Sequence, residues 1–273
     1  MDARCSRKRE VDWFGFKSHL TESCAKEEPI HLIVDVQTTS ATTPDVEYTE
    51  AIVQGVRQQG LAPRELLLDS GYLSGPLLVR QRAQGTELLG PVLPHPSWQH
   101  REQQGFAAAA FEVNWQQQQV RWPAGQLSCR WKSSSDKRGQ PTITVLFAPT
   151  IWQACPLHAC CTRGSTHGRS LTLPPQSVAL ALQERRRQQS GPAFQQQYAQ
   201  RAGIEATLSQ AVRRHDLRKT PYRGLSKTHL HHVCLASAIN LVRIDTFLQA
   251  QAQDQPARPP RPPSPFARLR VAA

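Results

Sequence analysis

The sequence feature that most constrains the fold is a buried-strand pattern that ends in a carboxylate. Residues 66–68 are leucines, and Asp69, Ser70 and Gly71 follow them directly. A short apolar run bounded by turn-forming residues predicts a buried strand, and glycine lets the chain turn sharply after it. Ligands and metal ions collect where such strands end in α/β proteins, although an Asp in this place is also a common turn former or helix N-cap. Asp69 is therefore a candidate acid, with a purely structural role as the alternative.

The first hundred residues alternate strand and helix patterns. Residues 14–20 and 31–37 predict two strands of an antiparallel hairpin, and residues 45–59, closed by Gly60, predict a helix. A strand at 65–68, a helix at 74–84 and a strand at 87–93 complete the pattern. This order predicts an α/β fold built on one mixed sheet.

The remainder of the chain divides into three predicted regions. Alternating polar and apolar residues between 98 and 172 predict a β-rich insertion. Helical spacing follows, over 175–189, from 192 to about 214, and over 225–251. Residues 252–273 form a basic, proline-rich tail that cannot pack a core and is expected to be disordered. The expected boundaries are 1–97 and 173–251 for the two parts of one catalytic domain, 98–172 for the insertion and 252–273 for the tail.

The composition favours a polyanionic partner. Lys and Arg total 33 against 21 Asp and Glu, which leaves a formal charge of +12. Such an excess is typical of proteins that bind nucleic acid. No segment approaches the ~20 apolar residues that cross a bilayer, and no apolar stretch follows the charged N-terminus, so we expect a cytoplasmic protein without a membrane partner.

A second candidate acid lies on a helix rich in cations. Tyr198, Arg201, Glu205 and Ser209 are spaced by three, four and four residues, which predicts that they share one helix face. Cations crowd downstream of them. The candidate phosphate-binding side chains are Lys17, Tyr198, Arg201, Arg213, Arg214, Arg218, Tyr222, Arg223 and Lys227. A surface ion pair and a solvated basic face are the alternatives. Two carboxylates beside phosphate-binding cations favour metal-dependent phosphoryl transfer, for which a third carboxylate from an earlier strand is normally required.

The cysteines favour reduced thiols over disulfides, because their number is odd and no signal peptide precedes them. Cys155, His158, Cys160 and Cys161 are close enough in sequence to be compatible with zinc, but no C-x-x-C pair is present. Reduced cysteines in a loop are the alternative.

Several motifs together resemble the DDE-type transposases of bacterial insertion sequences. The motifs are residues 7–20, 39–45, 68–72, 90–92, 201–210 and 222–229. The resemblance runs from the N-terminus to about residue 247 and implies an RNase H-like catalytic fold with a β-rich insertion and C-terminal helices. It also implies double-stranded DNA as partner, namely element ends and target DNA, and homo-oligomers in the full-length family. In a bacterial cell the protein would be nucleoid-associated when bound to DNA.

The resemblance assigns roles to individual residues. Asp69 is the second metal-binding acid and Glu205 the third, and the pair would hold Mg²⁺ or Mn²⁺. Tyr198 and Arg201 match the Tyr and Arg of the family signature, whereas its later basic position is Val212 here. The branch often carries a four-cysteine zinc set in its insertion. This chain has Trp in two of those places and keeps Cys155 and Cys161, which argues against structural zinc.

The first acid of the family has no counterpart in this sequence, because Asp2 and Asp12 are poor substitutes for it. We therefore expect an N-terminally truncated transposase that catalyses no strand transfer unless another copy or fragment supplies the first strand. The alternatives are a non-catalytic DNA-binding remnant that inhibits full-length transposase, or a decayed reading frame. Loss of the opening strand would expose a sheet edge and reduce solubility.

Overall fold

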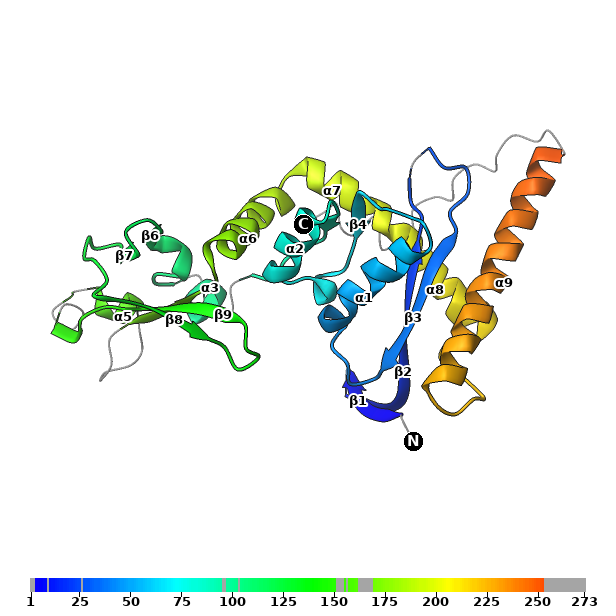
Figure 1. The fold of residues 1–273 in the computed structure, drawn as a ribbon, viewed down its shortest axis with the longest axis horizontal. Helices are drawn as coiled ribbons and strands as arrows, with labels where there is room; N and C mark the ends of the chain where they lie inside the picture. The colour runs from blue at the N-terminus through cyan, green and yellow to red at the C-terminus, as the bar shows by residue number, and fades with distance from the viewer. Residues whose placement is uncertain are drawn as a thin grey trace. The chain divides into compact units, whose positions relative to one another are not determined.

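The computed structural model describes residues 3–8, 10–25, 27–94, 97–102, 104–150, 155, 157–161 and 169–252 (Figure 1). The predicted tail at 252–273 lies outside the described residues except for Ala252, and Asp2 also lies outside them. The chain forms two compact units. Unit 1 comprises Met1–Thr42 and Ala202–Ala273, and unit 2 comprises Thr43–Arg201.

The sheet of unit 1 is antiparallel with the order β1-β2-β3. Its strands are β1 (Arg4–Lys8), β2 (Val11–Glu22) and β3 (Ile33–Ser40). The predicted hairpin is confirmed, because Phe16 pairs with Ser40 and Leu20 with Val36. The first hairpin, β1 with β2, places Asp12 opposite Arg7 as an exposed ion pair at 3.8 Å.

Two helices pack against this sheet. They are α8 (Ala202–His215) and the long helix α9 (Leu225–Ala252). Ile33 of β3, Ala211 of α8, and Ala236 and Ile239 of α9 form a buried apolar cluster. The Asn240 side chain accepts a hydrogen bond from Ile33 N at 2.9 Å and donates one to Ile33 O at 2.8 Å. These contacts fix α9 along β3 (Figure 1).

Histidines line part of the contact between β3 and α9. His232 is 4% exposed, and its Nδ1 lies 2.9 Å from the Thr38 hydroxyl, which is also 3.2 Å from His229 Nδ1. The pKa of His232 is lowered to about 4, mainly by burial and also by the neighbouring His231, His229 and His19. An uncharged imidazole is therefore built into this core.

The helical part of unit 2 surrounds a short parallel pair of strands. Its elements are α1 (Asp45–Gln58), β4 (Glu65–Leu67), η1 (Ser70–Tyr72), α2 (Gly75–Ala83) and β5 (Glu87–Leu89). The helices and strands correspond to predicted elements. The core contains Val53 of α1, Leu77 and Leu78 of α2, and Leu66 and Leu88 of the two strands.

The prediction of one mixed sheet is wrong for the residues that the structure describes. The three antiparallel strands of unit 1 and the two parallel strands of unit 2 form separate sheets. The strand predicted at 87–93 ends at Leu89, because Gly90 turns away and Pro91 has no N–H to donate to a ladder. The mixed α/β composition is confirmed, and the RNase H-like arrangement stays a prediction.

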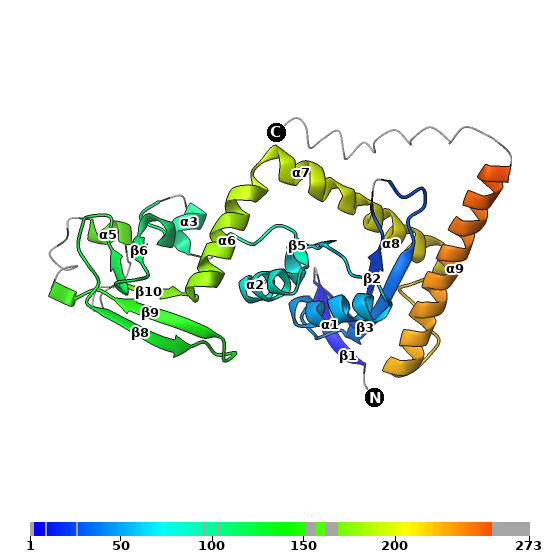
Figure 2. The ribbon, with the colours of Figure 1, turned by 45° about the horizontal axis from the view of Figure 1, so that its top comes forward.

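The predicted β-rich region contains two small sheets. One pairs β6 (Glu112–Asn114) with β7 (Gln119–Arg121), and the other has the order β10-β9-β8. Its strands are β8 (Arg130–Ser135), β9 (Pro141–Leu146) and β10 (Ser170–Leu173), which run side by side in Figure 2. Short helical turns accompany them: α3 (Trp98–Glu102), η2 (Ala108–Ala110) and α5 (His158–Cys161). The Trp122 ring packs on Phe147 and Phe111, with ring centroids 5.0 and 5.9 Å away.

Helical segments follow the β-rich region. They are α6 (Gln176–Gln189), α7 (Pro192–Tyr198) and η3 (Ala199–Arg201), after which α8 begins. The predicted helical segment from 192 to about 214 is confirmed in extent, and a 3₁₀ turn at 199–201 interrupts it. Its 3₁₀ turn changes the angular spacing, because i→i+3 bonding has 3.0 residues per turn. Tyr198, Arg201 and Glu205 consequently lie on three successive helical elements.

Helix α9 is the one helix, among the described residues, that is long and apolar enough to span a bilayer by length and composition. The sequence expectation that no segment approaches this length is therefore wrong. The prediction missed it because Lys227, the histidines and Asn240 interrupt the apolar pattern. The same test is passed by core helices of soluble proteins.

We predict that Gly90→Ala destabilises unit 2. A Cβ at this position would overlap the Leu68 carbonyl oxygen and lie 2.6 Å from Leu73 Cδ1. Overpacking of this kind costs about 1–3 kcal/mol, measurable by urea denaturation. Gly71→Ala is the matched control, because its nearest contact would be Asp45 Oδ2 at 3.7 Å. Equal stability of the two variants would contradict the prediction.

We predict that unit 1 loses stability as the pH falls from about 6.5 to about 4. Over this range unfolded His232 binds a proton and folded His232, whose pKa is about 4, does not. The loss is at most about 3–4 kcal/mol, at ~1.4 kcal/mol per pKa unit. The raised pKa of buried Asp35 acts in the opposite direction, because its folded form keeps a proton above pH 3.8.

Chemical denaturation of the chain and of His232→Gln at several pH values measures this dependence. Below pH 6.5 the free energy of unfolding of the variant should change less steeply with pH than that of the wild type. Equal slopes would contradict the assignment to His232.

Candidate active site and nucleic-acid interface

Asp69 lies where the parallel pair of strands ends. Leu68 N donates to Leu89 O at 2.8 Å, so the pairing continues to the residue before Asp69. The side chain of Asp69 caps η1, since its Oδ1 accepts from Ser70 N at 2.7 Å. The side chain is 55% exposed. Asp69 therefore has the structural role of an N-cap, which the sequence offered as the alternative to catalysis. Its carboxylate is also accessible to a ligand.

Tyr198 and Arg201 are brought together with Asp69, all three within unit 2. Arg201 Nη2 lies 3.9 Å from Asp69 Oδ2, and the guanidinium carbon lies 6.0 Å from the centroid of the Tyr198 ring. Tyr198 stacks on Phe194 of α7 with centroids 5.7 Å apart. The signature residues thus form a small site in which a cation lies beside the accessible carboxylate.

A second carboxylate approaches this site from α1. Asp45 Oδ2 would lie 3.7 Å from a Cβ on Gly71. The Thr49 hydroxyl donates to Tyr72 O at 2.7 Å, which ties η1 to α1. Burial raises the pKa of Tyr72, and the carboxylates of Asp45 and Asp69 raise it further, while Arg201 opposes them. The phenol therefore stays protonated. The sequence indicated Asp45 only as the start of a helix. Its distance from Asp69 in the sequence does not predict that the two residues lie close together in the fold.

Glu205 lies in the first turn of α8, and its side chain is exposed. A carboxylate is favourable at this end of a helix because the N-terminal N–H groups carry partial positive charge. Glu205 belongs to unit 1, whereas Asp69 belongs to unit 2.

The donor chemistry of Asp69 and Glu205 suits Mg²⁺, which prefers carboxylate oxygens. Within the described part of the chain, no group of three or more His, Cys, Asp or Glu side chains could hold a metal ion. These two residues therefore supply suitable oxygens without completing a site.

A buried polar cluster that sequence reasoning missed holds α8 in place. Glu22 of β2 has a side chain 6% exposed, and its Oε1 lies 3.3 Å from Arg243 Nη1 of α9. The Thr207 hydroxyl of α8 donates to Glu22 Oε2 and accepts from Arg243 Nη2 at 2.5 Å. Arg243 Nη1 also donates to His31 O at 2.8 Å. Residues this distant in sequence leave no local pattern, so only the fold could show the cluster.

The predicted cations downstream of Glu205 form one exposed surface on unit 1. We define the basic surface as Arg213, Arg214, Arg218, Lys219, Tyr222, Arg223 and Lys227, all of which are exposed. The loop between α8 and α9 positions it through hydrogen bonds from Leu217 N to Ala211 O at 3.1 Å and from Lys219 N to Asp216 O at 2.7 Å. The Tyr222 ring packs edge-on against His231 at 5.6 Å. Lys17 lies on β2 opposite Thr39.

The cysteines considered for zinc lie in the β-rich region. Cys155 and Cys161 are both buried, and burial raises the pKa of Cys161 to about 11. Metal binding by these cysteines would release the thiol protons, because the thiolate is the species that binds. The backbone of His158 belongs to α5, and its side chain lies outside the described part of the structure.

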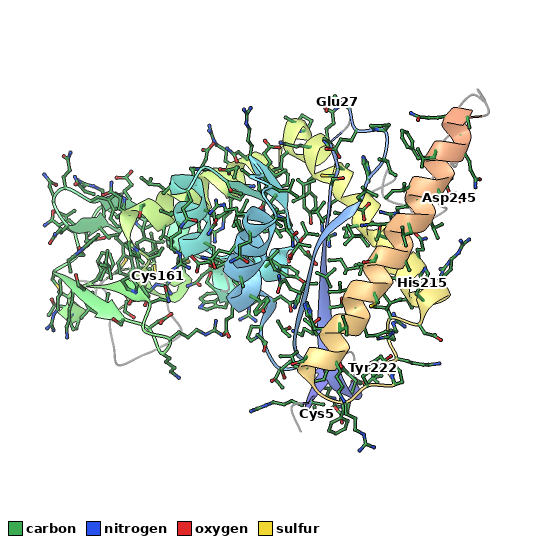
Figure 3. The ribbon with its side chains drawn as sticks, turned by 45° about the vertical axis from the view of Figure 1, so that its right-hand side comes forward. Cys5, Glu27, Cys161, His215, Tyr222 and Asp245 are labelled. Carbon is green, nitrogen blue, oxygen red and sulfur yellow. The ribbon has the colours of Figure 1, made fainter. Side chains whose placement is uncertain are left out.

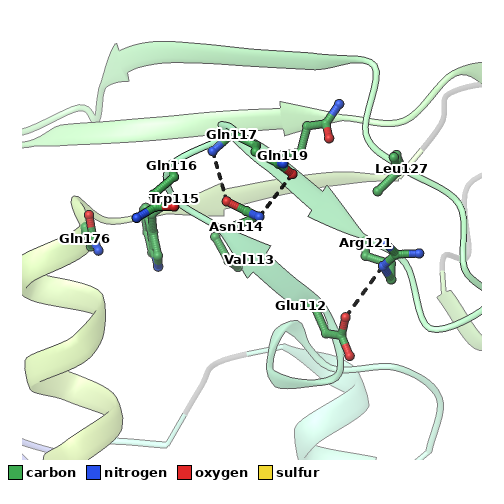
Figure 4. Close-up of a pocket in the computed structure, with 10 residues that line it drawn as sticks. All are labelled: Glu112, Val113, Asn114, Trp115, Gln116, Gln117, Gln119, Arg121, Leu127 and Gln176. Atoms are coloured by element: carbon green, nitrogen blue, oxygen red, sulfur yellow. Dashed lines mark hydrogen bonds and ion pairs between the residues drawn. The ribbon is translucent and has the colours of Figure 1, made fainter.

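A cavity of about 450 Å³ lies beside β6 and β7 (Figure 4). Side-chain amides and the Trp115 ring form much of its lining. Asn114 Oδ1 accepts from Gln117 N at 2.9 Å, and Arg121 pairs with Glu112 at 3.6 Å. These contacts shape the hairpin loop beside the cavity, whose lining also includes Val113 and Leu127.

Comparison with known proteins finds a similarity over part of the chain. Residues 122–245 match the family described as transposase DDE domain. The match confirms the resemblance to DDE-type transposases and indicates a function in DNA transposition. The matched segment contains Glu205 and the basic surface, and Asp69 precedes it. No curated protein matches the chain. No solved structure matches it either.

We predict that Arg243→Met destabilises unit 1 by about 3–5 kcal/mol, because it leaves the Glu22 carboxylate buried without its cation. Urea denaturation measures the loss. Glu22→Gln in the same chain should recover part of it, since the uncompensated charge is gone. Arg187→Met is the matched control, because its pair with Glu184 is exposed and worth under about 1 kcal/mol. Similar losses in the two Arg variants would contradict a buried ion pair.

Proposed function

We propose that the chain is the catalytic and DNA-holding part of a DDE-type transposase that cleaves and joins double-stranded DNA with divalent metal. The observation that carries the proposal is the juxtaposition, within the matched segment, of Glu205 and the basic surface on the same helix-loop-helix. Six cations against the single acid Asp216 in this stretch favour contacts to several phosphates.

The residues of the two sites have separate roles. Asp69 and Glu205 are the acids that would hold Mg²⁺ or Mn²⁺, which when bound activates the attacking oxygen and stabilises the leaving oxygen of the phosphodiester. The guanidinium of Arg201 offsets the negative charge of Asp69 and supplies a positive charge for a phosphate that binds near it. The Tyr198 ring packs against the Arg201 guanidinium and limits its movement. The basic surface neutralises the backbone of the bound duplex.

The first acid of this mechanism is not assigned to a residue of the chain. Asp12 is exposed and paired with Arg7 in the β1–β2 hairpin, at 3.8 Å. We therefore expect no strand transfer by the purified chain unless another polypeptide supplies the acid. Nicking of supercoiled plasmid that requires Mg²⁺ and disappears in Asp69→Ala would contradict this expectation and show a complete site.

A second candidate function is DNA binding without catalysis, as in an inhibitor of full-length transposase. The observation that favours it is the basic surface, whose six exposed cations bind phosphates without a metal ion. Failure to nick or join DNA, even with a full-length transposase present, together with inhibition of that transposase, would support this candidate.

We predict that DNA binding depends on the basic surface and not on the acids. Replacing Arg213, Arg214 and Arg218 by Gln should weaken binding to a duplex. It should also reduce the slope of log K against log salt by about 0.9 for each phosphate that the protein no longer neutralises. Asp69→Ala with Glu205→Ala should retain affinity. Fluorescence anisotropy over a range of salt concentrations measures both.

Arg130, Lys132 and Arg138, replaced together by Gln, form the matched control. They are exposed on the β8–β9 hairpin, and their replacement removes the same charge. Equal losses for the two triple variants would show that net charge, and not this surface, determines binding.

A further inference from the structure

The exposed side of α9 carries an apolar stripe with coiled-coil spacing. We define the α9 stripe as Leu230, Cys234, Ser237, Leu241, Ile244 and Leu248, which follow one another at intervals of 4, 3, 4, 3 and 4 residues. All six are exposed, and Leu230, Leu241 and Leu248 are 63%, 67% and 56% exposed. A mean spacing of about 3.5 residues keeps a seam facing a partner helix along its whole length.

The opposite side of α9 is the one that packs on unit 1. Its buried residues are Thr228, His232, Leu235, Ala236 and Ile239. At about 100° per residue, these positions lie on the side of the helix away from the stripe. Hydrogen bonds from Asn240 to Ile33 and contacts of His232 with Thr38 fix that orientation. The stripe is therefore held outward, whereas an ordinary surface helix carries polar residues on this side.

We propose that the α9 stripe binds the same stripe of a second copy of the chain, with the two helices antiparallel. The stripe is self-complementary about Ser237, because a two-fold axis there places Leu230 opposite Ile244 and Cys234 near Leu241 of the other copy. A small residue at the crossing point allows close approach of the helices.

Charge favours the antiparallel direction. Lys227 and Asp245 lie on the same flank of the stripe, near opposite ends of the helix. Figure 3 shows Asp245 near one end of α9 and Tyr222, of the basic surface, beyond the other. Antiparallel packing brings Lys227 of one copy toward Asp245 of the other, whereas parallel packing would place both basic surfaces at the same end and repel.

The length of the contact sets its strength. The stripe spans about 27 Å at 1.5 Å per residue, so one helix pair forms a smaller interface than the roughly 1,200–2,000 Å² of stable complexes. The dimer should therefore dissociate in the micromolar range. It would place two basic surfaces at the two ends of the α9 pair, an arrangement suited to two DNA segments. The dimer itself does not depend on the proposed catalytic function.

Sedimentation velocity of the full chain between about 1 and 100 µM tests the proposal. The wild type should shift from monomer to dimer, and Leu230→Glu with Leu241→Glu should stay monomeric. Leu61→Glu with Leu180→Glu is the matched control, because both leucines are exposed outside the stripe at 42% and 49%. Circular dichroism of each variant checks folding. A monomeric wild type, or a control that dissociates equally, would overturn the proposal.

Cross-linking with a copper–phenanthroline oxidant tests the direction. Ser237→Cys in a Cys234→Ala background should give a covalent dimer, because residue 237 lies on the two-fold axis. Wild-type Cys234 should not, since its Cα would be displaced by about 9 Å along the axis from its equivalent, beyond disulfide reach. Efficient cross-linking through Cys234 would show parallel packing and overturn the antiparallel dimer.

Flotation with phosphatidylcholine–phosphatidylglycerol vesicles tests whether the α9 stripe binds a membrane surface and not a second copy of the chain. The dimer predicts no flotation that depends on the stripe. A wild type that floats as a monomer, and a Leu230→Glu/Leu241→Glu variant that does not, would assign the stripe to a lipid surface and overturn the proposal.

Discussion

The buried ion pair between Glu22 and Arg243 is the interaction on which the organisation of unit 1 depends. It joins β2 to α9, and Thr207 connects α8 to both charged groups. A buried carboxylate without its partner is costly, so these three elements are held in one arrangement. Gly203 and Thr207 are one helical turn apart and face Glu22, whereas Glu205 lies between them in sequence and is exposed. The cluster thus fixes the helix that presents the candidate acid.

The same arrangement determines both exposed surfaces of unit 1. With α8 and α9 packed on the sheet, the loop that joins them carries the basic surface outward. The side of α9 away from β3 then presents the apolar stripe. One surface has the charge density for a polyanion and the other has the spacing for a helix. DNA binding and self-association can therefore be changed independently by mutation.

Local patterns in the sequence predicted the elements that depend on local physics. Alternation predicted β2 and β3, apolar periodicity predicted α1 and α9, and leucines before Asp69 predicted a strand that ends there. The motif residues Tyr198, Arg201 and Asp69 are brought together by the fold, although the sequence spacing indicated only that Tyr198 and Arg201 lie on one helix face with Glu205. The 3₁₀ turn at 199–201 was missed because alanine, glutamine and arginine are all good helix formers. The Glu22–Arg243 pair and the division into two sheets depend on contacts distant in sequence, which no window of residues contains.

The most direct test of the central claim is hydrogen–deuterium exchange of the full chain with and without a duplex of about 30 base pairs at low salt, where phosphate binding is strongest. The account predicts slower exchange in peptides that cover residues 205–227, which contain the helix of Glu205 and the basic surface. The β8–β9 hairpin should be unchanged. Slower exchange confined to the β-rich region, with no change at 205–227, would contradict the assignment of the DNA-binding surface.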